Sequence, residues 1–312
     1  MRVLILGAGA IGGCYGARLI EAGHDVAFLV RPARAALLAK HGLRIRGGRG
    51  DFSQPVQAIT AVAAGAHYDL AVVSCKAYDL DSAIAAIAPA VGDRTLVLPL
   101  LNGVRQLDAL DAAFGAAHVL GGVCHISVTL DAEGAVHQFG SLDRLTFGSR
   151  DPAMSVPVDI AAGLHTLGPN VIHSADILAA MWEKFAFIAT LAGLTCLMRG
   201  SVGEIVVTAD GADLARRLYV ECTETARRSG HVLSTTATID AERVLTMPNS
   251  PLKASMLRDL ERGARTECEH ILGDMRARAI AHALDTPLLA AALTHLRVYE
   301  GVRVATNSTE RT

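Results

Sequence analysis

Three glycines near the start of the chain have the spacing of a loop that binds a dinucleotide. Gly7, Gly9 and Gly12 form the pattern G-x-G-x-x-G, between an apolar run at residues 3–6 and an expected helix at residues 11–22. Gly7 would permit a tight turn, Gly9 the approach of a pyrophosphate to the backbone, and Gly12 close packing of the helix on the strand. The N-terminus of such a helix attracts phosphate. The pattern therefore predicts a dinucleotide site; the alternative is a glycine-rich turn without a ligand.

The residue that follows the second expected strand, at residues 26–30, bears on which dinucleotide would bind. NAD enzymes usually carry an acid there for the ribose hydroxyls, whereas this chain has Arg31, with Arg34 close behind. A guanidinium suits a 2′-phosphate, and no acid competes for the place in the sequence. We therefore expect NADP (as NADPH) rather than NAD. The alternative is that both arginines are solvated surface residues.

Further motifs carry a family resemblance that covers nearly the whole chain. The motifs are Arg31, Ser74-Cys75-Lys76-Ala77-Tyr78, Asn102-Gly103, Trp182-Glu183-Lys184, Gly203-Glu204, Ser255-Met256 with Asp259, and Thr266-Glu267 before Gly273. Each motif is unspecific alone, but their order and spacing are specific. With these motifs and the glycine pattern, the sequence resembles the ketopantoate reductases (2-dehydropantoate 2-reductases).

The resemblance implies a role for five of these residues. Lys184 matches the family's general acid, which protonates the substrate's carbonyl oxygen as hydride arrives from NADPH. Asn102 matches a residue that touches both cofactor and substrate, and Ser255 matches a substrate contact. Lys76 and Glu267 match residues of the cofactor site. The implied activity is reduction of a 2-oxo acid, with ketopantoate as the first-named substrate and a place in pantothenate biosynthesis.

The role implied for Lys184 is chemically sound by itself. Hydride addition to a ketone builds negative charge on oxygen, and an ammonium group can stabilise that charge and then donate its proton. Each assignment has a plainer alternative. Lys184 could be a helix-surface lysine, Ser255 an ordinary helical serine, and Glu267 an acid that favours a helix N-terminus.

Three positions depart from the family's pattern. The family places asparagines four and eight residues after the catalytic lysine, on the same helix face, and a third further on; here they are Ile188, Ala192 and Val202. Each lost neutral hydrogen bond weakens binding by about 0.5–1.5 kcal/mol, so kcat/KM for ketopantoate would fall roughly 10²-fold. This favours a less polar 2-oxo acid with an alkyl or aryl tail. Three residues could supply the missing polar contacts: Thr195, Arg199 and Asn249.

The composition limits other functions. The chain has 29 Lys and Arg against 31 Asp and Glu and only 4% aromatic residues, which argues against nucleic-acid binding. The six cysteines and twelve histidines lack metal-ligand spacing, and the scattered single cysteines suit a reducing cytoplasm. No uninterrupted apolar stretch reaches the roughly 18 residues of a membrane span. We expect a cytoplasmic enzyme without a metal or a membrane partner. A non-catalytic NADP-binding sensor, which needs the glycine loop and Arg31 but not Lys184, is the competing class.

The elements that must position these residues fall into two halves. Apolar strand-like runs alternate with helices through the first half, which predicts an α/β fold with a doubly wound parallel sheet. Strands expected at residues 126–130, 135–139 and 145–147 would extend the edge of that sheet with antiparallel pairing. We expect a Rossmann domain over residues 1–173 and a helical substrate and catalytic domain over residues 174–312.

The second half is predicted to be all-helical, beginning with a long apolar helix at residues 174–197. Ser250 before Pro251 predicts a helix start, with an N-cap and a proline at the first helical position. Thr266 and Glu269 have the spacing of a capping box and predict another. The apolar helices of this half could support a homodimer.

Overall fold

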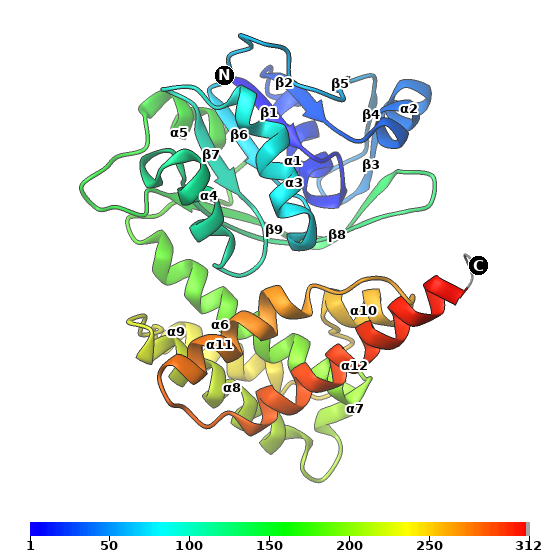
Figure 1. The fold of residues 1–312 in the computed structure, drawn as a ribbon, viewed down its shortest axis with the longest axis vertical. Coiled ribbons are helices and arrows are strands. Elements are labelled where there is room, and N and C mark those ends of the chain that lie inside the picture. Colours follow the sequence, from blue (N-terminus) through cyan, green and yellow to red (C-terminus); the bar gives the residue numbers. More distant parts are fainter. Residues whose placement is uncertain (310–312) are drawn as a thin grey trace. The chain divides into compact units, whose positions relative to one another are not determined.

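The computed structural model describes residues 1–309, which form two compact units (Figure 1). Unit 1 comprises residues 1–101 and 106–180. Unit 2 comprises Asn102–Arg105 and the chain from Met181 onward. The expected fold class, a doubly wound parallel sheet followed by a helical half, is confirmed. The domain limits expected at residues 173 and 174 stay a prediction.

Unit 1 is built on a five-stranded parallel sheet in the order β5-β2-β1-β6-β7. The strands are β1 (Arg2–Leu6), β2 (Asp25–Leu29), β5 (Gln57–Ile59), β6 (Leu70–Val73) and β7 (Leu96–Pro99). Most of their residues are buried, as expected for apolar runs covered on both faces. The strand order reverses between β1 and β6, and ligands of open α/β sheets bind beyond the carboxyl ends of the strands at such a point.

Helix α1 lies between this sheet and a second one, because its glycines allow close approach on both sides. A Cβ at Gly16 would lie 2.3 Å from Phe28 of the first sheet, and one at Gly13 would lie 3.2 Å from Val136 of the second. The helices of unit 1 are α1 (Ala10–Glu21), α2 (Pro32–His41), α3 (Leu80–Ile87), α4 (Gln106–Phe114) and α5 (Val158–His165). Short 3₁₀ turns add η1 (Ala77–Asp79), η2 (Ala88–Ala90) and η3 (Ala116–His118).

The second sheet corrects one expectation. Its strands are β3 (Leu43–Gly47), β4 (Phe52–Gln54), β8 (Gly121–Leu130), β9 (Val136–Gly148) and β10 (Val171–His173). They run in the order β10-β9-β3-β4, with β8 paired to β9. The expected antiparallel pairing of β8 with β9 is confirmed, but its place at the edge of the first sheet was wrong. Val136, Leu145 and Phe147 of β9 are buried in the core that includes α1, so this strand belongs to a separate layer.

Unit 2 is helical and packs around α6 (Ile177–Met198), which starts in unit 1. This helix is long and apolar enough to cross a membrane, but 61% of its most apolar window is buried inside the protein. A place in the core therefore accounts for its composition. The remaining helices are α7 (Val202–Val206), α8 (Gly211–Arg228), α9 (Thr235–Leu245), α10 (Ser255–Glu261), the π-helix η4 (Glu269–Gly273), α11 (Asp274–Ala281) and α12 (Pro287–Thr309).

Of the two helix starts expected in the second half, the one at Ser250 was wrong, whereas a helix does begin shortly after Thr266, at Cys268, without the expected capping box. The carbonyl oxygen of Ser250 accepts a hydrogen bond from the N–H of Gly203, so this segment supports the start of α7. Helix α10 begins only at Ser255. The Thr266 N–H and hydroxyl both donate to Glu300, at 2.6 and 2.8 Å, and Glu269 pairs with Arg297. Contacts with α12 therefore replace the capping box expected there.

Candidate active site

The glycine loop after β1 is held by two neighbouring strands. Gly7 has a φ of +94°, a left-handed conformation that strongly favours glycine. Its N–H donates to the carbonyl of Leu29 at the end of β2, at 3.0 Å. Ser74, which follows β6, donates its hydroxyl to the carbonyl of Leu6, also at 3.0 Å. A Cβ at Gly12 would lie 2.1 Å from the Gly7 oxygen, so the three glycines fix one compact loop.

The loop fits the pyrophosphate of a dinucleotide. Helix α1 begins after Gly9, and in residues 1–309 no side chain caps its first turn and no acid lies within that turn. Its free N–H groups and dipole can therefore meet an anion. A Cβ built at Gly9 meets no described atom within 4 Å, so the backbone there faces open space. These are the features that close approach of a phosphate requires.

The two arginines after β2 have different surroundings. Arg34 donates from Nε to the carbonyl of Ala8, at 2.9 Å, and from Nη1 to that of Gly134, at 2.8 Å. Burial lowers the pKa of its guanidinium. Arg34 thus ties the glycine loop to the turn between β8 and β9 and is not a solvated residue. Arg31 has a side chain that is 74% exposed and pairs with Asp79, at 2.7 Å. Of the two, Arg31 is the one exposed to solvent.

Lys76 lies directly after β6, where the chain turns into η1. Its backbone is extended, and it occupies the N-cap of this short helix. The carbonyl of Lys76 accepts a hydrogen bond from the N–H of Asp79, at 2.9 Å, which closes the turn. The structure therefore places Lys76 and Arg31 beyond the carboxyl ends of β6 and β2, the strands on either side of β1 and its glycine loop.

Lys184 lies in unit 2, on α6, with a half-buried side chain. Ile188 follows one turn later on the same helical face and is also half-buried. Ala192 and Val202, by contrast, are 4% and 0% exposed. Of the three departures from the family's pattern, Ile188 is therefore the one that keeps accessible surface on the face of Lys184.

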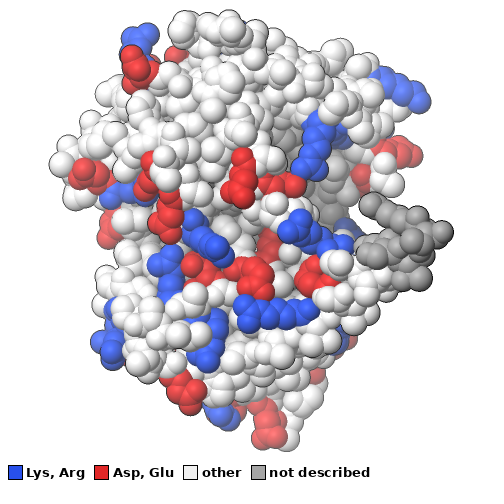
Figure 2. All heavy atoms as spheres, viewed as in Figure 1, with Lys and Arg blue, Asp and Glu red and all other residues white. Residues whose placement is uncertain are grey.

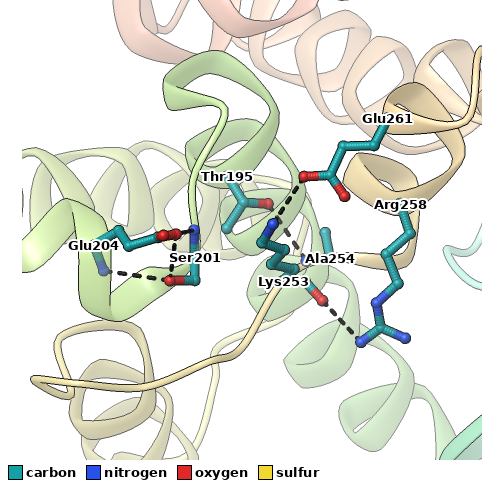
Figure 3. Close-up of polar contacts among 7 residues, drawn as sticks. All are labelled: Thr195, Ser201, Glu204, Lys253, Ala254, Arg258 and Glu261. Carbon is teal, nitrogen blue, oxygen red and sulfur yellow. Dashed lines mark hydrogen bonds and ion pairs between the residues drawn. The ribbon is translucent and has the colours of Figure 1, made fainter.

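The structure shows different surroundings for the three residues considered as replacements for the missing amides. Thr195 is fully buried, and its hydroxyl donates to the Leu191 carbonyl, at 2.7 Å. The same hydroxyl accepts a hydrogen bond from the N–H of Ala254, at 3.4 Å (Figure 3). Arg199 and Asn249 are exposed and have φ values of 58° and 57°, so both occupy left-handed turn positions. Thr195 therefore positions the start of α10.

Ser255, the first residue of α10, is exposed at the point that Thr195 holds. The segment before it is also bound to α10 itself: Lys253 pairs with Glu261, at 2.8 Å, and Arg258 donates to the Lys253 carbonyl, at 3.4 Å (Figure 3). These contacts hold both ends of the turn that presents Ser255. The sequence motif marked Ser255, but its position depends on Thr195 of α6 and on contacts within residues 253–261.

Asn102 and Glu267 are linked through His270, a residue that none of the sequence motifs indicates. His270 Nε2 lies 3.0 Å from the carbonyl oxygen of Asn102. The Glu267 carbonyl accepts hydrogen bonds from the N–H groups of His270 and Ile271, both at 3.1 Å, at the start of η4. Gly103, with a φ of +86°, turns the chain beside the imidazole. Burial lowers the pKa of His270. No local pattern joins residues so far apart in the sequence.

Acidification should destabilise the protein through His270. Because its pKa is lowered from the ordinary 6.5, the unfolded chain binds the proton at a pH where the folded protein does not. Its contribution to stability is therefore complete above about pH 6.5 and is lost as the pH falls through the lowered pKa. His270→Gln, which keeps a donor but does not titrate, should flatten the fall in Tm between about pH 7.5 and 5.5.

His24→Gln is the matched comparison for this thermal unfolding series. Burial and the N-terminal ammonium group also lower the pKa of His24, so this variant removes a second contribution of the same sign. Each variant should remove its own part of the acid sensitivity. A fall in Tm as steep in His270→Gln as in the parent protein would contradict the assignment to His270.

The predicted residues therefore fall into two groups. The structure gathers Gly7, Gly9, Gly12, Arg31 and Lys76 at the strand ends of unit 1. Unit 2 contains Asn102, Lys184, Ser255 and Glu267. Acidic and basic side chains are interspersed on the face in Figure 2. Among the described residues, no group of three or more His, Cys, Asp or Glu could hold a metal ion.

Comparisons with known proteins match both halves of the chain. The family model "Ketopantoate reductase PanE/ApbA" matches residues 3–152, and "Ketopantoate reductase PanE/ApbA C terminal" matches residues 176–300. The uncharacterized oxidoreductase YkpB of Bacillus subtilis is 34% identical over 301 residues, which cover 96% of this chain and 99% of that protein. The 2-dehydropantoate 2-reductase of Archaeoglobus fulgidus is 31% identical and covers 87% of this chain, with 88% of its own length matched. A crystal structure of a PanE/ApbA family ketopantoate reductase from Ralstonia eutropha JMP134 has a TM-score of 0.86 at 27% identity, over 97% of this chain and 99% of that one.

Proposed function

Because the chain is an oxidoreductase that belongs to the ketopantoate reductase family, we propose that it catalyses the NADPH-dependent reduction of a 2-oxo acid to a 2-hydroxy acid. Ketopantoate to pantoate is the first-named reaction. The observation that carries the proposal is a glycine loop with an uncapped helix N-terminus in unit 1, in a chain that also carries Lys184, Asn102 and Glu267 in unit 2. A small-molecule substrate, a cytoplasmic location and a homodimer belong to the same proposal.

Each residue has a distinct task in this reaction. NADPH, when bound, supplies the hydride. The glycine loop and the start of α1 bind its pyrophosphate, and Arg31 pairs with its 2′-phosphate. Lys184 stabilises the negative charge that develops on the carbonyl oxygen and donates the proton to it. Asn102 and Ser255 orient the substrate, and His270 holds the backbone of Asn102 in place.

A less polar 2-oxo acid is the second candidate substrate, and Ile188 is the observation that favours it. This side chain is accessible one turn from Lys184, where the family has an amide. Thr195 cannot readily replace that amide, because its hydroxyl already bonds to Leu191 and Ala254. A buried substrate hydroxyl without a partner beside Ile188 would lose binding free energy.

Two substrates that differ by one hydroxyl test this choice. Ketopantoate is 4-hydroxy-3,3-dimethyl-2-oxobutanoate, and 3,3-dimethyl-2-oxobutanoate lacks only the hydroxyl. The wild-type protein should have the higher kcat/KM with the second compound. Ile188→Asn should shift the ratio of the two kcat/KM values toward ketopantoate by about two- to tenfold, the effect of one neutral hydrogen bond. NADPH oxidation followed by absorbance measures both values.

Ile239→Asn is the control, because Ile239 is an exposed isoleucine of α9. It should leave the substrate ratio unchanged. Preference of the wild-type protein for ketopantoate would contradict the second candidate and establish the first. Tight NADPH binding without turnover of any 2-oxo acid would contradict both and favour the non-catalytic sensor.

A further inference from the structure

An acidic residue lies at the position that is expected to select the cofactor. Oδ1 of Asp79 is 2.7 Å from Nη2 of Arg31. No acid stands next to Arg31 in the sequence, because Asp79 follows β6 rather than β2. The two strands lie on opposite sides of β1, and the turns beyond their carboxyl ends bring the two side chains together. The site of the 2′-phosphate thus contains both a cation and an anion.

Both residues are held by their backbones. The carbonyl of Arg31 accepts hydrogen bonds from the N–H groups of Arg34 and Ala35, at 2.9 and 3.0 Å, and Pro32 begins α2 directly after it. The N–H of Asp79 donates to Lys76, at 2.9 Å, and its carbonyl accepts from the hydroxyl of Ser82, at 2.8 Å. The ion pair therefore joins two fixed turns rather than two loose loops.

In the part of the chain that the structure describes, the carboxylate of Asp79 does not cap the helix that follows it. Asp79 is the N-cap residue of α3, and an aspartate there commonly accepts a hydrogen bond from the first turn of its own helix. Within the described part of the chain, its side chain makes no such bond. It points to Arg31 instead. The Asp79 side chain is 29% exposed against 74% for Arg31, so the carboxylate is the more enclosed partner of the pair.

We infer that Asp79 limits the preference for NADPH, so that this protein accepts NADH as a second cofactor. The inference rests on the proposed assignment of Arg31 to the 2′-phosphate. A 2′-phosphate must compete with the Asp79 carboxylate for the guanidinium, and it also meets the negative charge of that carboxylate. The ribose of NADH carries hydroxyls instead, and a carboxylate is the acceptor that NAD sites use for them. Arg31 and Asp79 therefore favour opposite cofactors.

Asp79→Asn tests the inference with the full-length protein and the cofactor alone. The dissociation constants of NADPH and NADH are measured from the change in cofactor fluorescence, without any 2-oxo acid. NADPH should bind more tightly and NADH more weakly, so the ratio of the two constants should shift about tenfold toward NADPH, given the sizes of exposed ion pairs and charged hydrogen bonds. In an Arg31→Ala background, the gain in NADPH binding should disappear.

Asp81→Asn is the matched control, since it removes the same charge from an exposed position in the first turn of α3. Its cofactor ratio should match that of the wild-type protein. If Asp79→Asn does not fold, Asp79→Ser replaces it, because serine is also a good N-cap. An unchanged ratio, or an equal shift in Asp81→Asn, would overturn the inference alone. A wild-type protein that binds neither cofactor would overturn the proposed function as well.

Discussion

Replacing Lys184 with alanine should lower kcat by about 10²–10⁴-fold, the usual contribution of a positioned acid or base. The physical reason is that the variant lacks the ammonium group that stabilises and protonates the developing alkoxide. NADPH binding should stay close to that of the wild-type protein, because the glycine loop and Arg31 belong to unit 1. Single-turnover NADPH oxidation at saturating cofactor measures the rate, and cofactor fluorescence measures the binding.

Two comparisons separate chemistry from structure in this variant. Lys40→Ala removes an exposed lysine of α2 and should leave kcat unchanged. Added ethylamine should restore part of the rate to Lys184→Ala, since it returns an ammonium group to the space vacated by the side chain. Full activity of Lys184→Ala would rule out Lys184 as the proton donor. A lowered Tm together with lost NADPH binding would show that the residue is structural.

Adding one methyl group to the glycine loop should give opposite results at two neighbouring positions. In Gly9→Ala, the new Cβ meets no described atom within 4 Å, so folding should be unaffected. The methyl group would occupy the space that the pyrophosphate needs, and NADPH affinity should fall by at least about 10²-fold, because a phosphate displaced from the helix N-terminus loses charge-assisted hydrogen bonds. In Gly12→Ala, the Cβ would lie 2.1 Å from the Gly7 oxygen and 2.3 Å from Ser74 Oγ. The backbone must move, which should cost about 3 kcal/mol or more of stability.

Urea unfolding and NADPH titration distinguish the two effects. Gly9→Ala should keep the unfolding midpoint of the wild-type protein and lose affinity for NADPH. Gly12→Ala should instead have a lower unfolding midpoint in urea. Gly23→Ala provides a comparison beyond the far end of α1, where no ligand is expected. It should keep NADPH affinity but lose stability, because a φ of +83° is strained for alanine. Normal NADPH affinity in a stable Gly9→Ala would remove the glycine loop from the cofactor site.

Local patterns in the sequence were sufficient for the elements that depend on neighbouring residues. The glycine loop, α1 and the strands β1, β2, β6 and β7 follow from short apolar runs and from the spacing of the glycines. The short edge strand β5, which has no such run, was not predicted. The antiparallel pairing of β8 with β9 was predicted because it joins adjacent segments. The second sheet was not, since β9 pairs with β3, which lies far earlier in the chain.

Residues that act through distant partners could not be predicted in the same way. Thr266 and Glu269 satisfy the local rule for a capping box, yet Glu300 and Arg297 of α12 bind them. A capping box does form at Ser201 and Glu204, where the side chain of each residue accepts a hydrogen bond from the backbone N–H of the other (Figure 3). Asp79 and His270 likewise have partners on distant segments, Arg31 and Asn102, and these contacts suggest their roles. A sequence pattern records which contacts are possible locally but not which distant contact will replace them.

The short segment Asn102–Arg105 also affects the order in which contacts can form during synthesis of the chain. It belongs to unit 2, although the residues on both sides of it belong to unit 1. Its partner His270 is separated from Asn102 by 168 positions in the chain. A ribosome that adds about 5–20 residues per second would complete that stretch on the order of ten seconds later. During synthesis, strand β7 and helix α4 can therefore form early. The hydrogen bond between the turn that joins them and His270 can form only after residue 270 has been translated.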